Sequence, residues 1–184
     1  LVVVLVLAAF VVLIIAKTAV VVPQQNAYVV ERLGKYNATL GAGFHILVPF
    51  IDVVRYRHSL KETAVDIPEQ VCITRDNVQV HVDGVIYLQV LNAERASYGV
   101  SDYLFAISQL AQTNLRNVIG EMQLDESLTS REKINAALRQ ILDDATDKWG
   151  VRVVRVELQR IEPPLDVTEA MHRQMKAERT KRAL

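Results

Sequence analysis

LVVVLVLAAFVVLIIA, residues 1–16, is a run without a single polar side chain. Lys17 and Thr18 interrupt it, and four more apolar residues continue it to Pro23. A helix needs about 20 apolar residues to cross the hydrocarbon core of a bilayer, with a usual range of about 17 to 25. The run reaches that length if Lys17 extends its ammonium group to the lipid headgroups. We therefore predict a transmembrane anchor over residues 1–22.

Two other interpretations of this run are less favoured. A secretory signal has an apolar region of about 7 to 15 residues followed by a cleavage site with small residues, and here Lys17 would lie inside that site. A buried strand or core helix would need other parts of the protein to cover sixteen consecutive apolar residues at a chain end. The anchor fits the sequence better than either of these.

The overall charge argues against nucleic-acid binding, and the cysteine content excludes two kinds of site. The 184 residues contain 21 lysines and arginines and 21 aspartates and glutamates, so the net charge is zero. General nucleic-acid binding needs a basic excess that displaces counterions, and the sequence has none. Cys72 is the only cysteine. An intrachain disulfide or a metal site built from several cysteines is therefore impossible.

Charges next to the predicted anchor indicate its orientation. Lys17, Arg32, Lys35, Arg55 and Arg57 follow the apolar run. Short segments rich in lysine and arginine stay on the cytoplasmic side of a membrane. We therefore expect a single-pass protein of the inner (plasma) membrane whose body lies in the cytoplasm.

Residues 23–68 have the features of a small β-rich unit close to the membrane. Residues 27–36 are rich in β-branched and aromatic side chains and predict one strand. Gly41 and Gly43 mark a turn, and the apolar residues 44–51 follow it. Residues 52–60 and 63–67 continue as strands, and we expect Pro68 to end the last of them.

Residues 69–162 predict strands followed by helices. Residues 78–90 alternate between apolar and polar side chains, as in a half-buried strand. A short helix over residues 93–98, a second capped by Asp102 and a third that begins near Thr129 come next, and a strand over residues 151–161 closes the unit. The stripes that contain Leu115 and Leu138 should cover the apolar face of the 78–90 strand, which gives an α+β fold. The two predicted stripes are Leu104, Ile107, Ala111, Leu115, Val118, Ile119 and Met122, and Ile134, Leu138, Ile141, Leu142, Ala145 and Trp149.

The sequence contains no recognisable catalytic or metal-binding motif. His45, His58, His81 and His172 do not pair at the spacing of metal ligands, and neither a nucleophile elbow nor a glycine-rich phosphate loop occurs. Cys72 lies in a predicted strand without a neighbour that would activate it, so a structural role is favoured. We predict that the protein is not an enzyme and holds no cofactor and no metal.

Several short segments resemble the stomatin/prohibitin/flotillin (SPFH, or band-7) family. The resemblance begins at VPQQ (22–25) and YVVERLGKY (28–36), and it continues at LGAGFHILVP (40–49). The remaining matches extend almost to the end of the chain, and the closest branch is the stomatin-like-2 or paraslipin type of prokaryotes. They are SLKE (59–62), DNV (76–78), DGVIYL (83–88), ASYG (96–99), QLAQT (109–113), WG (149–150) and AERTKRA (177–183).

The resemblance implies a fold and a function. It implies an N-terminal transmembrane helix (1–22), two small α/β SPFH subdomains (23–68 and 69–162) and the start of a long coiled-coil helix (163–184). It also implies a non-enzymatic scaffold that binds membrane lipids and assembles into a large homo-oligomeric ring or cage. Such a scaffold organises membrane microdomains and membrane-protein quality control. The alternative is a regulatory subunit of an AAA membrane protease or of an NfeD-type membrane partner.

Two groups of residues are candidates for these roles. The apolar run around Pro49 lies close to the anchor, and we expect its side chains to contact the near leaflet. The last helix has both charge signs beside small apolar residues spaced by seven, as on a helix that lies beside copies of itself. The predicted membrane contacts are Phe44, Leu47, Phe50 and Ile51, and the predicted oligomerisation residues are Val167, Ala170, Met171, Arg173, Ala177, Glu178, Arg179 and Leu184.

Overall fold

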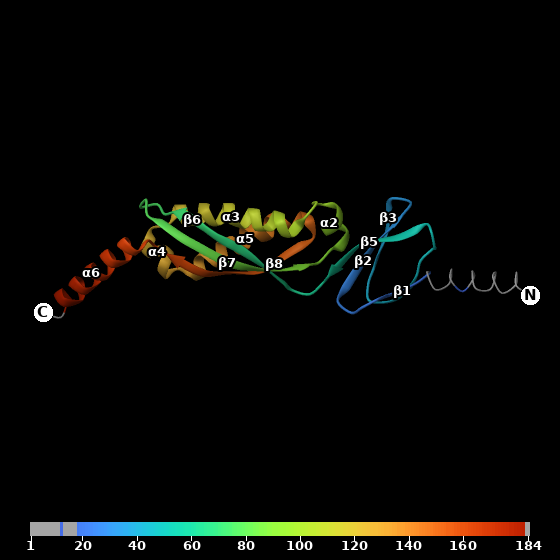
Figure 1. Ribbon diagram of the computed structural model, residues 1–184, viewed down its shortest axis with the longest axis horizontal. Helices are drawn as coiled ribbons and strands as arrows, with labels where there is room; N and C mark the ends of the chain where they lie inside the picture. The colour runs from blue at the N-terminus through green and yellow to red at the C-terminus, as the bar shows by residue number, and fades with distance from the viewer. Residues whose placement is uncertain (1–11, 13–17, 183–184) are drawn as a thin grey trace, which may run out of the picture. The chain divides into compact units, whose positions relative to one another are not determined.

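A computed structural model of the chain describes Val12 and residues 18–182, except for the side chains of residues 172, 174, 178, 179, 181 and 182 (Figure 1). Most of the predicted anchor therefore lies outside the described residues. Among the residues that are described, no helix is both long enough and apolar enough to cross a membrane. The last four residues of the predicted anchor, Ala19–Val22, form a β-strand instead.

The contacts within the chain divide it into two units. Unit 1 combines the described residues up to Thr63 with Gln89–Tyr103 and Asp147–Arg152. Unit 2 combines Ala64–Leu88, Leu104–Thr146 and the residues from Val153 onward. Two later segments of the chain thus belong to unit 1, and the domain boundary at Pro68 stays a prediction.

Unit 1 contains two small antiparallel sheets. Strand β1 pairs with β4, and in the second sheet β2 lies between β3 and β5. One core cluster contains Val22, Val30, Leu40 and Leu47, and a second one packs Ala27 and Val29 against Ala93 of the helix α2. The elements of unit 1 are β1 (Ala19–Val22), β2 (Asn26–Arg32), β3 (Lys35–Leu40), β4 (Gly43–Ile46), β5 (Asp52–Ser59), α2 (Ala93–Tyr98) and the 3-10 helix η1 (Asp147–Trp149).

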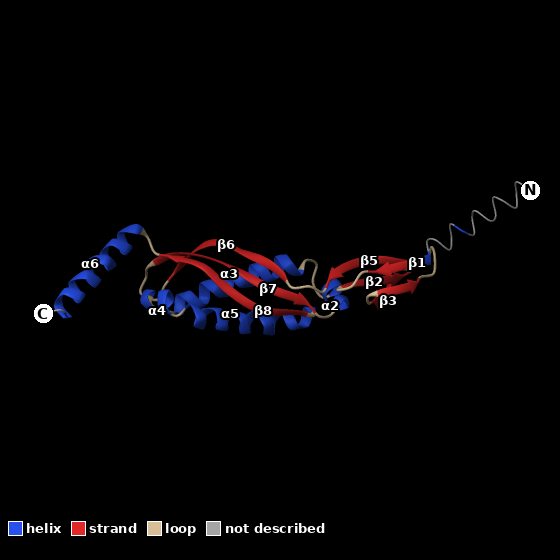
Figure 2. Cartoon of the chain, turned by 90° about the horizontal axis from the view of Figure 1, so that it is seen from below, coloured by secondary structure: helices blue, strands red, loops and turns tan. Residues whose placement is uncertain are grey.

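Unit 2 is built on a three-stranded sheet in the order β6-β7-β8. The helices α3 and α5 lie along the same face of this sheet (Figure 2). The side chains of Leu115 and Leu138 are completely buried, as the periodicity predicted, whereas the two stripe residues Leu104 and Ile141 remain exposed. The elements of unit 2 are β6 (Thr63–Ile73), β7 (Gln79–Val90), α3 (Tyr103–Glu121), α4 (Leu124–Thr129), α5 (Arg131–Thr146), β8 (Val151–Glu162) and α6 (Leu165–Arg182); β6, β7, α3 and β8 begin or end in unit 1.

Two predictions about local structure were wrong, and one helix was missed. The run 27–36 is not one strand but the hairpin β2–β3, which turns at Leu33 and Gly34. Pro68 does not end a strand but lies inside β6, because β6 is an edge strand, where a missing N–H costs no ladder hydrogen bond. The short helix α4 was not predicted at all. Its first turn is capped from a distance, since Asp76 accepts the N–H of Leu124 at 3.1 Å.

The outer edge of β8 is occupied by side chains of α5. The N–H of Val153 donates to Asp143 at 3.0 Å, and the N–H of Leu158 donates to Asn135 at 3.1 Å. Because β8 pairs only with β7, these N–H groups lie on the side that has no neighbouring strand. The same helix therefore covers one face of the sheet and satisfies part of its edge.

Candidate membrane-contact surface

The β2–β3 hairpin presents a leucine at its tip. Arg32 and Lys35 pair across the strands, so Leu33 and Gly34 make a two-residue turn. Both have positive φ, 51° and 81°, as in a type I′ turn, whose first position favours Asn, Asp or Gly. A bulky apolar residue is rare in this left-handed region. Leu33 is nevertheless 82% exposed, so packing against the protein does not explain its presence.

The segment between β4 and β5 presents a second apolar tip. The carbonyl of Val48 accepts the N–H groups of Ile51 and Asp52, at 3.4 and 2.9 Å, which closes a tight turn. Phe50 in this turn has a φ of 69° and is 80% exposed. The backbone at Leu33 and at Phe50 is therefore left-handed, and both large apolar side chains are exposed to solvent.

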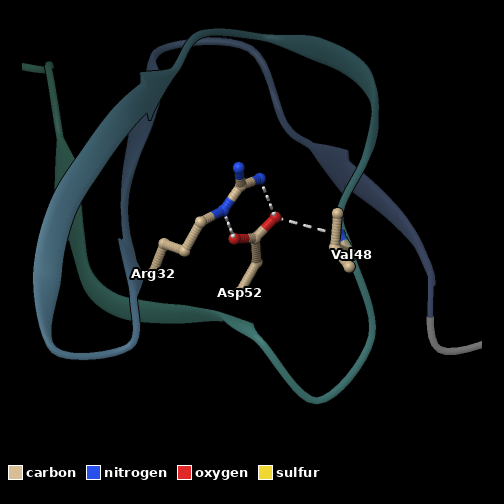
Figure 3. A network of polar contacts seen from close by, with 3 residues as sticks. All are labelled: Arg32, Val48 and Asp52. Atoms are coloured by element: carbon tan, nitrogen blue, oxygen red, sulfur yellow. Dashed lines mark hydrogen bonds and ion pairs between the residues drawn. The ribbon is translucent and has the colours of Figure 1, made fainter.

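An ion pair joins Arg32, which precedes the hairpin turn, to Asp52, which ends the second turn (Figure 3). Arg32 Nε donates to one carboxylate oxygen of Asp52 at 2.7 Å, and Nη2 donates to the other at 3.0 Å. The second oxygen also accepts the N–H of Val48 at 2.9 Å. The hydrogen bonds from Arg32 and Val48 hold the pKa of Asp52 at about 2, against an ordinary value of 3.8. The carboxylate is therefore ionised at neutral pH.

The two tips are joined directly. The N–H of Leu33 donates to the carbonyl of Ile51 at 3.3 Å, so the hairpin turn and the second loop lie side by side. Arg32 and Asp52 are also paired residues of β2 and β5. The three exposed side chains at this end of the sheet, which we call the apolar tips, are Leu33, Phe50 and Ile51.

The β1–β4 sheet adds an apolar face. Val21 pairs with Phe44, and Ala19 pairs with Ile46, so these four side chains point to the same side. All four are exposed, Phe44 to 65% and Ile46 to 74%. The opposite side of the ladder contributes Val22 to a core cluster. Large exposed apolar patches on a soluble protein mark interaction surfaces or membrane contacts.

Three of the four predicted membrane contacts lie in the apolar tips or on the exposed face of β1–β4, and one does not. Phe44, Phe50 and Ile51 are exposed, whereas Leu47 is only 8% exposed and packs with Val22, Val30 and Leu40. Leu47 therefore belongs to the core of unit 1 and not to its apolar surface. Sequence reasoning also missed Leu33, because Leu-Gly is not among the residue pairs that signal a two-residue hairpin turn, and only Gly34 indicated a turn.

The predicted oligomerisation residues lie on or near α6. Val167 and Met171 are partly exposed, and Ala170, Arg173 and Ala177 are exposed. The side chains of Glu178 and Arg179 and the whole of Leu184 lie outside the described residues. Assembly through this helix therefore stays a prediction.

A histidine and a serine of unit 1 make a contact of a type that also occurs in catalytic sites. His58 Nε2 lies 2.7 Å from Ser97 Oγ, and Ser97 donates its only hydroxyl proton to the carbonyl of Ala93, also at 2.7 Å. With its proton directed to that carbonyl, Ser97 Oγ accepts a hydrogen bond from His58, and Nε2 then presents an N–H rather than a lone pair to the serine. Within the described part of the chain, no group of three or more His, Cys, Asp or Glu side chains could hold a metal ion.

Comparison with known proteins supplies the family context. A sequence profile of the SPFH domain / Band 7 family matches residues 20–184. An uncharacterised protein of the archaeon Methanothermobacter thermautotrophicus is 57% identical over 155 residues, which are 84% of this chain and 48% of that protein. Stomatin-like protein 2, mitochondrial, of Homo sapiens is 45% identical over 162 residues, which are 88% of this chain and 46% of that protein.

A third relative covers almost the whole chain. It is an uncharacterised protein of Mycobacterium tuberculosis, 48% identical over 179 residues, which are 97% of this chain and 47% of that protein. The chain thus spans about half the length of the curated relatives that it matches.

Proposed function

Because this chain belongs to the SPFH domain / Band 7 family, we propose that it is the membrane-bound part of a non-enzymatic scaffold. On this proposal, residues 1–22 contain a single membrane anchor, and the body lies on the cytoplasmic side of the plasma membrane. Unit 1 then contacts the lipid surface beside the anchor. The similarity to a stomatin-like protein, at 45% identity, supports the proposal.

The observation that carries this proposal is the apolar surface of unit 1. Leu33 and Phe50 are held in a backbone conformation that costs a bulky side chain about 1 to 2 kcal/mol, and yet they bury little of their own surface. Strained residues of this kind are characteristic of functional sites. An interfacial lipid layer would accept the apolar tips and the apolar face of β1–β4.

We further propose that copies of the chain assemble through α6 and the sequence beyond it into a ring or cage. Ala170, Arg173 and Ala177 are exposed and available for contacts between neighbouring helices. The measurement is the size of the complex in detergent, for the chain with its native downstream sequence and for the chain stopped at Pro163. We expect the large particle to disappear on truncation, and a particle of unchanged size would place assembly elsewhere.

Membrane contact can be tested by quenching of tryptophan fluorescence with lipids that carry bromine in their acyl chains. Trp149 is the only tryptophan, so Trp149→Phe gives a silent background. The full chain is incorporated into vesicles with one new tryptophan, either Phe50→Trp in the apolar tips or Ile73→Trp, a half-exposed position of β6 in unit 2. We expect strong quenching at position 50 and little at position 73. Equal quenching at the two positions would refute the membrane contact.

A further inference from the structure

We propose that Asp52 is a positioning residue that holds Phe50 and Ile51 beside Leu33, so that the apolar tips meet the membrane as one surface. This inference rests on the proposed membrane contact of unit 1. It adds that the geometry of the contact is set by a charged residue that itself touches no lipid. The hairpin tip at Leu33 should not depend on Asp52, whereas the second tip at Phe50 and Ile51 should.

The hairpin tip needs no help from Asp52. The turn at Leu33 and Gly34 is closed by the paired strands β2 and β3, whose register runs up to Arg32 and Lys35. Its backbone conformation follows from the two-residue loop length. The side chain of Leu33 should therefore stay at its place when the carboxylate of Asp52 is altered.

The second tip depends on Asp52 directly. The turn from Val48 to Asp52 has no paired strands to close it, and its hydrogen bonds from Ile51 and Asp52 converge on one carbonyl. The carboxylate of Asp52 accepts the N–H of Val48 and so closes this turn from the other side. Residues in left-handed conformations persist only where surrounding contacts fix them. The turn that carries Phe50 is held by the carboxylate of Asp52 at Val48 and by the bond from the N–H of Leu33 to the carbonyl of Ile51.

Arg32 fixes Asp52 in turn. Its guanidinium binds both carboxylate oxygens, which is the strong and directional form of an ion pair. The side chain of Asp52 is only 2% exposed, so an ionised carboxylate without this partner would be unfavourable. Because Arg32 is the last residue of β2 and Leu33 follows it, the same ion pair connects the loop to the hairpin tip (Figure 3).

The test compares the two tips in vesicles that contain the brominated lipids. Tryptophan is placed at position 33 or at position 50 of the full chain, in the Trp149→Phe background, and each probe is combined with Asp52→Asn. We expect the quenching at position 50 to fall to less than about half, because an amide cannot hold Arg32 and Val48 as a carboxylate does. Quenching at position 33 should not change. Asp66→Asn, at an exposed position of β6, is the matched control and should change neither probe.

The thermal unfolding temperature of Asp52→Asn shows whether this variant is folded. If it is not, a second variant tests the inference. Arg32→Gln removes the guanidinium and leaves the bond between Asp52 and Val48 in place. The quenching at position 50 should then fall below that of the parent chain but stay above half of it, and the quenching at position 33 should not change. Quenching at position 50 that is the same with and without the carboxylate would overturn the inference, and so would an equal loss at both positions. If neither tryptophan is quenched in the parent chain, the proposed membrane contact fails, and the positioning role fails with it.

Discussion

Units 1 and 2 use the same apolar residue types in opposite ways. In unit 2 the apolar side chains of β7, α3 and α5 that face inward are buried, as Ile86, Leu115 and Leu138 show. In unit 1 the large side chains Leu33, Phe44 and Phe50 are among the most exposed of the described residues. The long periodic stripes of unit 2 thus indicate the protein core, whereas part of the apolar sequence of unit 1 forms a surface. The backbone makes the difference, because tight turns and the outer face of the β1–β4 ladder leave their apolar side chains exposed.

The largest expected effect concerns the core of unit 2. Leu138 lies in the middle of α5 and is completely buried. Leu138→Ala should lower the free energy of unfolding by about 2 to 5 kcal/mol, through lost apolar burial and the cavity left behind. Urea denaturation measures the change, with the exposed neighbour Arg139→Ala as the control. A loss under about 0.5 kcal/mol would show that this helix face does not pack on the sheet.

Alanine substitutions at two glycines, one in each unit, test how tightly the backbone is packed there. A Cβ atom at Gly84 of β7 would lie 2.8 Å from the backbone oxygen of Glu157, whereas a Cβ atom at Gly41 of unit 1 would meet nothing within 4 Å. Gly84→Ala should therefore lower the free energy of unfolding by about 1 to 3 kcal/mol. Gly41→Ala should leave it unchanged or raise it slightly. Similar losses in both variants, measured by thermal unfolding, would contradict the contrast.

A smaller effect should appear in unit 1 as the pH falls. Burial lowers the pKa of His58 below its ordinary value of 6.5, so the unfolded chain takes up a proton more readily than the folded one. His58 faces Ser97 of α2 and the rings of Tyr56 and Tyr103. The thermal unfolding temperature should be constant above about pH 6.5 and should decline below it. His58→Gln should flatten this decline, and identical pH curves for the two proteins would exclude the effect.

The smallest expected change of stability is at the hairpin tip. Leu33→Asn puts a residue that favours positive φ at the first position of the β2–β3 turn. The free energy of unfolding in urea should change by less than about 0.5 kcal/mol, even though a large apolar side chain is removed. A loss above about 1 kcal/mol would mean that Leu33 packs against the protein and is not free for a membrane.

The sequence predicted unit 2 better than unit 1, for a physical reason. Helical stripes such as the one with Leu115 have one period over many residues, and a covering sheet is their simplest explanation. In unit 1 the decisive features are local turns and distant pairs. The hairpin was missed because Leu33 occupies a position that usually carries Asn, Asp or Gly. The pair of Arg32 and Asp52 joins residues twenty positions apart, and no pattern along the chain relates them.

The misassignment of Leu47 has a similar origin. Phe44, Ile46, Leu47 and Phe50 belong to one apolar run, and periodicity cannot tell which of them points inward. The pairing of β1 with β4 decides this, because it sends Phe44 and Ile46 to one side of the sheet. Leu47 follows β4 and enters the core cluster with Val22.

The edges of the unit 2 sheet have a consequence for aggregation. An open strand edge offers free N–H and C=O groups on which another chain can add a strand and begin a fibril. At β8, Asp143 and Asn135 already bind two of these N–H groups, and at β6, Pro68 has none to offer. A protein that is crowded with copies of itself on a membrane would meet such edges at high local concentration. Both edges of this sheet carry features that hinder the growth of a shared β-sheet between neighbours.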